Sequence, residues 1–175
     1  MYIFANSFLN MKCKIVKIPQ LSGKAASVYS VVLEGDTDTG TLLNKFVTEN
    51  EILFKSETID ILKRLHTIGH LTGCREQFFK DNEGKPGDGV CAIYDEDSKL
   101  RLYCIRYGTQ LIVVGSGGKK PKSIRALQES DKLKDENYFL RNLSVLISER
   151  IQEKEIRFSD DGMDFIGDLE FNDEE

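Results

Sequence analysis

No stretch of the 175-residue chain approaches the roughly 20 consecutive apolar residues that a membrane-spanning helix needs. The sequence also lacks a Cys-x-x-Cys pair, because its four cysteines (Cys13, Cys74, Cys91 and Cys104) are widely scattered. The apolar N-terminal stretch has no basic lead and is too short for a secretory signal. These absences predict a cytoplasmic protein with reduced thiols, not a membrane protein, a disulfide scaffold or a zinc-binding domain.

Two segments each lack one sign of charge. Residues 99–128 hold seven basic side chains and no acidic one, whereas residues 159–175 hold eight acidic side chains and no basic one. The net charge of −5 conceals this asymmetry. The cationic segment can attract phosphate or carboxylate groups. If the acidic end competes for this segment, deleting residues 159–175 should tighten nucleic-acid binding at low salt. The alternative is a tail that serves solubility alone.

The pattern of apolar residues predicts an α+β domain. A β-branched and aromatic run predicts a first strand, apolar residues at i, i+3 and i+4 predict helices, and short joints suit a three-stranded antiparallel meander. The expected order is strand, two helices, three strands and a helix, over residues 27–33, 41–47, 56–69, 90–94, 100–106, 110–114 and 131–153. We expect the first strand to lie beside the meander, with the helices packed on one face of a small sheet.

Both ends of the chain allow two interpretations. Residues 12–18 form either a short strand or an arm that ends at Pro19, and Met11 is an alternative start that would make residues 1–10 an extension. A turn signal at residues 160–162 predicts a small hairpin, or a tail that orders on binding. We therefore divide the chain into an N-terminal arm (1–26), an α+β domain (27–155) and an acidic C-terminal tail (156–175).

Two motifs resemble a metal site and a phosphate-binding loop, but neither has the complete pattern that such a site needs. His66, His70 and Cys74 have the fourfold spacing of ligands on one helix face, but Gly69 and Gly73 interrupt that helix, so we predict no metal site. The Gly-Ser-Gly-Gly-Lys-Lys run at residues 115–120 differs in spacing from a nucleotide-binding phosphate loop. It predicts a flexible exit that presents its two lysines to a phosphate backbone, or simply an exposed loop kept soluble by lysines.

The strand at residues 100–106 is the most informative segment. Alternation places Leu100, Leu102, Cys104 and Ile105 toward the core, and it places Arg101, Tyr103 and Arg106 on the other face. Basic groups and a ring on an open face suit single-stranded RNA, which offers phosphates and unstacked bases. The alternative is an ordinary solvated polar face.

Residues 98–120 (SKLRLYCIRYGTQLIVVGSGGKK) resemble the core of RelE/ParE-superfamily toxins, particularly the HigB-like branch. Those toxins carry an R-L-x-Y/F strand, a tight hairpin, an aliphatic strand and a Lys-Lys or Lys-Arg exit. The upstream order fits as well, with a strand at 27–33, two helices and a basic loop at 80–89. The resemblance covers roughly residues 27–128.

The resemblance implies a toxin of a type II toxin–antitoxin module that cleaves mRNA, usually at the ribosome, without a metal or other cofactor. A helix-turn-helix antitoxin would be its partner. The resemblance matches Arg101 to the strand arginine that stabilises the phosphorane, and Lys119 or Lys120 to the basic pair at the strand exit. No residue matches the family's general acid, so that role is open, with Tyr103 and Tyr107 as candidates. Lys80 and Lys85 lie where the family places its lysines ahead of the meander. The cationic segment adds Arg106, Lys122 and Arg125 as candidates for RNA binding.

Two alternatives stay open. A ParE-like toxin would bind DNA gyrase and would have no nuclease chemistry, and a catalytically silent member would be a protein-binding module. Under the nuclease interpretation, Arg101→Ala is expected to abolish cleavage with thermal stability little changed, because the side chain is expected on the surface.

Overall fold

A computed structural model of the chain describes residues 12–35, 40–80, 89–93, 99–119 and 131–172. In these ranges the strands are Lys12–Lys17 (β1), Ser27–Leu33 (β2), Phe79–Lys80 (β3), Val90–Ile93 (β4), Leu100–Tyr107 (β5), Leu111–Lys119 (β6), Ile156–Phe158 (β7), Phe165–Gly167 (β8) and Glu170–Asn172 (β9). The helices are Leu42–Asn50 (α2), Lys55–Thr67 (α3) and Asp131–Gln152 (α5), with a π-helical turn at Ile68–Thr72 and a 3-10 turn at Glu76–Phe78. None of these helices is both long and apolar enough to cross a bilayer.

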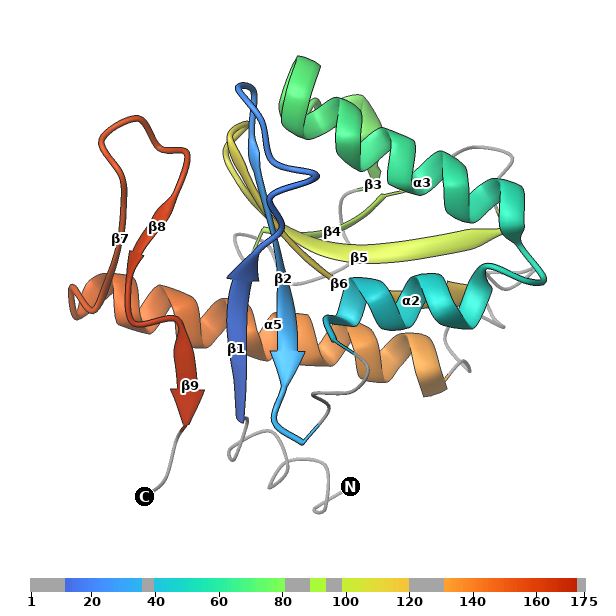
Figure 1. Cartoon of the computed structure of the whole chain (residues 1–175). Coiled ribbons are helices and arrows are strands. Elements are labelled where there is room, and N and C mark those ends of the chain that lie inside the picture. Colours follow the sequence, from blue (N-terminus) through green and yellow to red (C-terminus); the bar gives the residue numbers. More distant parts are fainter. Residues whose placement is uncertain (1–11, 36–39, 81–88, 94–98, 120–130, 173–175) are drawn as a thin grey trace.

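Seven strands form one mixed sheet in the order β3-β4-β5-β6-β2-β1-β9 (Figure 1). β2 runs parallel to β6, the last strand of the meander, and every other neighbouring pair is antiparallel. The sheet is therefore larger than the small sheet that we expected, because β1, β3 and β9 extend it at its edges.

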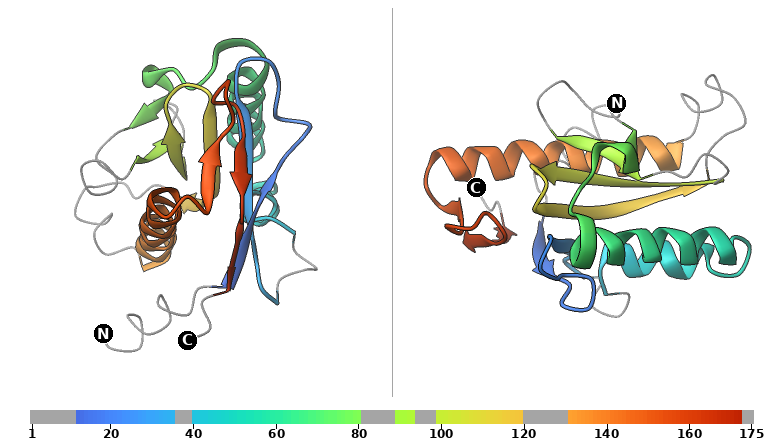
Figure 2. Two further views of the ribbon diagram at one scale, coloured as in Figure 1. Left: turned by 90° about the vertical axis from the view of Figure 1, so that its left-hand side faces the viewer. Right: turned by 90° about the horizontal axis from the view of Figure 1, so that it is seen from above.

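The helices cover both faces of the sheet, so the prediction of helices on one face is wrong. α5 lies on one face and α2 with α3 on the other, which Figure 2 shows from above. Each face has its own apolar core, one around Leu140 and Phe171 and the other around Phe46 and Leu65. The strands carry the signal for this arrangement: residues 111–114 are four consecutive apolar residues, all fully buried, which is typical of a strand covered on both sides.

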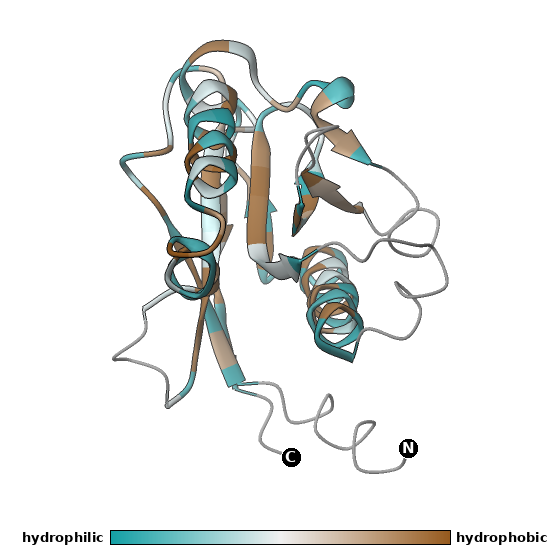
Figure 3. Cartoon of the chain, turned by 90° about the vertical axis from the view of Figure 1, so that its right-hand side faces the viewer, coloured by the Kyte–Doolittle hydropathy of each residue, from teal (hydrophilic) through white to brown (hydrophobic). Residues whose placement is uncertain are grey.

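Apolar strands occupy the centre of the molecule, and the helices turn polar residues outward (Figure 3). The periodic patterns that predicted helices at 41–47, 56–69 and 131–153 correspond to α2, α3 and α5. Thr41 caps α2, since its hydroxyl accepts a hydrogen bond from the backbone N–H of Asn44 at 3.2 Å.

The described residues nearest to the two chain ends belong to the central fold. β1 pairs with β2 and also with β9, and residues 156–158 and 165–167 form the hairpin β7–β8. The strand interpretation of residues 12–18 and the hairpin interpretation of the C-terminal segment are therefore correct. β1 and β9 belong to the central sheet and Phe171 of β9 is fully buried, so these described parts of the expected arm and tail pack with the α+β domain.

The glycines at 115–118 are part of a strand. All four residues are buried in β6, so the prediction of a flexible exit is wrong up to Lys119. A side chain at Gly115 would lie 2.8 Å from Leu140 of α5, and one at Gly117 would collide with the backbone carbonyl of Arg101. Small residues here allow α5 and β5 to approach β6 closely.

Candidate nucleic-acid interface

Arg101 and Tyr103 share one face of β5, as the alternation predicts, but this face is covered. Their side chains are only 2% and 3% exposed. Arg101 lies opposite Gly118, over which Lys132 and Leu133 of α5 are packed. The prediction of an open cationic and aromatic platform is wrong for these two residues, because α5 lies over it.

Lys119 lies at the end of β6, opposite Leu100, and its side chain is exposed. Residues directly opposite in an antiparallel pair share a face, and Leu100 belongs to the core under α2 and α3. Lys119 and Arg101 therefore lie on opposite faces of the sheet, and the structure does not bring them to one site. Lys99, which directly precedes Leu100, is also exposed at this end of the sheet.

Arg106 and Lys80, the other described residues of the predicted RNA site, also lie on different faces of the sheet. Arg106 holds its guanidinium 4.7 Å from the ring centre of Phe79, on the side of α2 and α3. Lys80 is exposed on the edge strand β3 and pairs with Ala92, which in turn lies opposite Tyr103 on the α5 side. Lys85, Lys120, Lys122 and Arg125 lie outside the described residues.

Lys132 of α5 contacts both β6 and α2, a role that the sequence pattern did not lead us to predict. Its ammonium group donates to the carbonyl of Gly117 at 2.7 Å and forms ion pairs with Glu49 of α2 at 3.0 Å and with Glu136 at 3.7 Å. Burial raises the pKa of Glu136, and the positive charges of Lys132 and Lys45 oppose that shift. The helix dipole disfavours a lysine in the first turn of a helix. A lysine at this position therefore indicates that its side chain contacts another part of the fold.

The histidines do not form a metal site with neighbouring ligands. The rings of His66 and His70 are stacked with their centres 4.2 Å apart, and Nε2 of His70 lies 3.1 Å from the carbonyl oxygen of Gln20. In the part of the chain that the structure describes, no group of three or more His, Cys, Asp or Glu side chains could hold a metal ion.

The acidic C-terminal segment makes its ion pairs with the N-terminal strand and with α5. Asp164 contacts Lys17 at 2.7 Å, Glu170 contacts Lys14 at 3.5 Å, and Asp168 contacts Arg150 at 3.6 Å. β9 lies at a sheet edge, separated from β6 by β1 and β2. These three acids therefore pair with β1 and α5, and their contacts are not with the cationic segment of residues 99–128.

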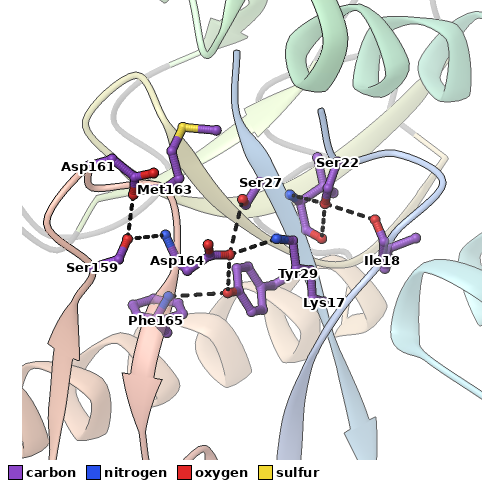
Figure 4. Close-up of polar contacts among 11 residues, drawn as sticks. Lys17, Ile18, Ser22, Ser27, Tyr29, Ser159, Asp161, Met163, Asp164 and Phe165 are labelled. Carbon is purple, nitrogen blue, oxygen red and sulfur yellow. Dashed lines mark hydrogen bonds and ion pairs between the residues drawn. The ribbon is translucent and has the colours of Figure 1, made fainter. Parts of the chain in front are cut away.

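Asp164 is the centre of a small polar cluster (Figure 4). Its carboxylate accepts hydrogen bonds from the Tyr29 hydroxyl at 3.2 Å and from Ser27 at 3.4 Å, besides its ion pair with Lys17. The Tyr29 oxygen accepts in turn from the backbone N–H of Phe165 at 3.1 Å. This cluster attaches the β7–β8 hairpin to the beginning of β2.

Replacing Tyr29 by phenylalanine is expected to lower the free energy of unfolding by about 1–3 kcal/mol, because the buried N–H of Phe165 loses its acceptor. Burial raises the pKa of Tyr29 to about 12 from 10.0. The unfolded chain releases this proton first, so wild-type stability falls as the pH rises from 10 toward 12, and the difference from the variant shrinks. Urea unfolding at pH 8 and at pH 11 measures both effects. Tyr138→Phe, on the exposed side of α5, is the control, and equal stability of Tyr29→Phe and wild type would refute the cluster's role.

Comparisons of the chain with protein-family models, with curated protein sequences and with solved structures find no match. The resemblance to RelE/ParE-superfamily toxins therefore depends on short motifs and on the order of elements alone.

Proposed function

We propose that the chain is the toxin of a type II toxin–antitoxin module, with a RelE-like core that binds mRNA and cleaves it. One observation carries the proposal. Residues 27–119 contain, in sequence, a strand, two helices, the two-residue strand β3 and the three strands β4, β5 and β6, which apart from β3 is the order of elements that accompanies the RelE-like motif. The motif occupies β5 and β6 of that meander.

Surface charge at one end of the sheet also supports RNA binding. β5 begins directly after the exposed Lys99, and β6 ends at the exposed Lys119, so the backbones of both lysines lie at the same end of the sheet. The chain continues from Lys119 into Lys120, Lys122 and Arg125. Cations clustered within about 10 Å reinforce one another at physiological salt and favour a phosphate backbone.

In the proposed reaction a 2′-hydroxyl of the RNA attacks the neighbouring phosphate, and the 5′-oxygen of the next nucleotide leaves. Lys119 and Lys120 would contact the phosphate and stabilise the charge that develops on it. Arg101, which lies under α5, is better suited to hold β5 in position than to meet the substrate, so we place it outside the contact set.

The double variant Lys119→Ala, Lys120→Ala is expected to lose growth arrest on overexpression and to cleave RNA more slowly, on the order of 10²-fold. Loss of two contacts to single-stranded RNA should also reduce the slope of log affinity against log salt by about 1.4. The measurements are mapping of new RNA 5′ ends and binding across a salt series. Lys55→Ala, another exposed lysine, is the matched control. Unchanged 5′ ends in the double variant would contradict the assignment.

A second candidate is a catalytically silent protein-binding module. Burial of Arg101 and Tyr103 favours it, as do Ile52 and Leu53, which are 85% and 82% exposed at the turn between α2 and α3. Growth arrest without new RNA 5′ ends would support this candidate. If a supercoiling assay then shows inhibition of gyrase, the ParE-like alternative applies instead.

A further inference from the structure

Two cysteines face each other across the meander. Cys91 of β4 and Cys104 of β5 are directly opposite in an antiparallel pair. Their sulfur atoms are 3.4 Å apart, and each lies 3.7–3.8 Å from the carbonyl oxygen of the opposite residue. Both side chains are almost completely buried, at 1% and 0% exposure. This pair belongs to no part of the proposed RNA site.

We propose that Cys91 and Cys104 are an oxidative modification site, at which a peroxide converts the two thiols into a reversible cross-strand disulfide. A disulfide needs its sulfur atoms about 2.05 Å apart and tolerates the separation of directly opposite residues in a sheet. The sulfur atoms therefore have to move toward each other by little more than an ångström, which side-chain rotation can supply without a change of strand register.

The chemistry balances with hydrogen peroxide as the oxidant. One thiolate attacks a peroxide oxygen, the O–O bond breaks, and a sulfenic acid and one water form. The second thiol then attacks that sulfur, the S–S bond forms, and a second water leaves. In total the two thiols lose two protons and two electrons, which the peroxide takes up as it becomes two waters, and a thiol reductant returns them by exchange.

Burial makes this site slow to react in the closed fold. It raises the pKa of Cys104, an effect that Arg106 partly opposes, so the reactive thiolate is scarce. Access is easiest from the sheet edge. In the described part of the chain, β3 pairs with Ala92 and Ile93 of β4 and not with Cys91. Local opening of this short edge would therefore expose Cys91 while β5 stays between its two neighbours.

Cys74 is the competing thiol. It is buried in the same core, and its charge would interact with those of both partners. Cys13, in β1, belongs to the core on the opposite face of the sheet. A disulfide that follows from the strand geometry should join Cys91 to Cys104 and should leave Cys74 and Cys13 as free thiols.

The test treats the full native chain with hydrogen peroxide, alkylates the remaining thiols and maps the peptides without reduction. We expect one linked pair, Cys91 with Cys104, that disappears after dithiothreitol, and a rise in the melting midpoint of about 5 °C from the closed loop. Cys91→Ala and Cys104→Ala should each abolish the linked pair, whereas Cys13→Ala should not. Circular dichroism before oxidation checks that each variant is folded.

Three results would overturn the proposal: a linkage through Cys74, sulfinic or sulfonic acids at these positions without a disulfide, or a linkage that forms only in urea. None of these outcomes depends on RNA cleavage, so failure of the disulfide and failure of the proposed function are distinguishable.

Discussion

Phe171→Ala is expected to lower the free energy of unfolding by about 3–5 kcal/mol, because it removes a fully buried ring from a close-packed core. The ring lies in the core on the α5 side of the sheet, and the guanidinium of Arg150 is 3.9 Å from its centre. Cys13, opposite Phe171 in the β1–β9 pair, is also buried. The cavity therefore opens between α5 and the sheet edge, where few groups can relax to fill it.

Urea unfolding followed by circular dichroism measures this loss. Phe158→Ala is the control, because that ring is 36% exposed at the end of β7 and its removal should cost much less. If Phe171→Ala unfolds within about 1 kcal/mol of the wild type, β9 is not part of the cooperative fold and the C-terminal segment is an appendage after all.

This result bears on the expected effect of deleting residues 159–175. The deletion removes Phe165 and Phe171, which are 7% and 0% exposed, together with the partner of Lys17. It should therefore reduce the folded population, and a change in RNA binding could not be attributed to charge. Substitution of exposed acids on the β7–β8 turn, such as Asp160→Asn, changes the charge without removing β9.

Local patterns predicted the local elements well. Apolar residues at helical spacing located α2, α3 and α5, and the Asp-Asp-Gly signal located the turn of the β7–β8 hairpin. These elements depend on neighbours in the chain, so their signals are readable from the residues themselves.

Pairing across the chain could not be read in the same way. β1 contacts β9, which joins residues 12–14 to residues 170–172, and no local pattern encodes such a partner. The sheet therefore has more strands than the local patterns predicted. The unbroken apolar run at 111–114 indicates that the sheet is buried on both faces, whereas the prediction of an open face on residues 100–106 requires one face to be exposed.

In the candidate site, the residue pattern of β5 likewise does not show which other elements pack against it. Alternation correctly separated Arg101 and Tyr103 from Leu100, Leu102 and Cys104, although Ile105 belongs with Tyr103 and Arg106 with the opposite set. Alternation cannot say which face meets solvent. That depends on α5, which begins twelve residues after β6 ends and returns over the meander.

Arg101→Ala is accordingly expected to lower the free energy of unfolding by about 3 kcal/mol, contrary to the expectation of an unchanged fold. The side chain is 2% exposed and is the largest of the fully buried ones. Arg101 lies opposite Gly118, on the face that the first turn of α5 covers, so truncation of this buried side chain leaves a cavity as well as removing a charge. Loss of growth arrest in this variant would therefore follow from unfolding, whatever the role of the guanidinium.

Arg101→Met separates the two effects, because it keeps an unbranched stem of similar length and removes the charge. We expect the methionine variant to recover part of the stability that alanine loses, and Lys119→Ala, at an exposed position, to unfold like the wild type. Melting midpoints and RNA cleavage are measured on the same preparations. If the methionine variant is as stable as the wild type but cleaves no RNA, the guanidinium acts on the substrate and our exclusion of Arg101 from the contact set is wrong. If cleavage follows the folded fraction across all three variants, Arg101 supports β5 under α5, and the catalytic cations are those at the end of β6.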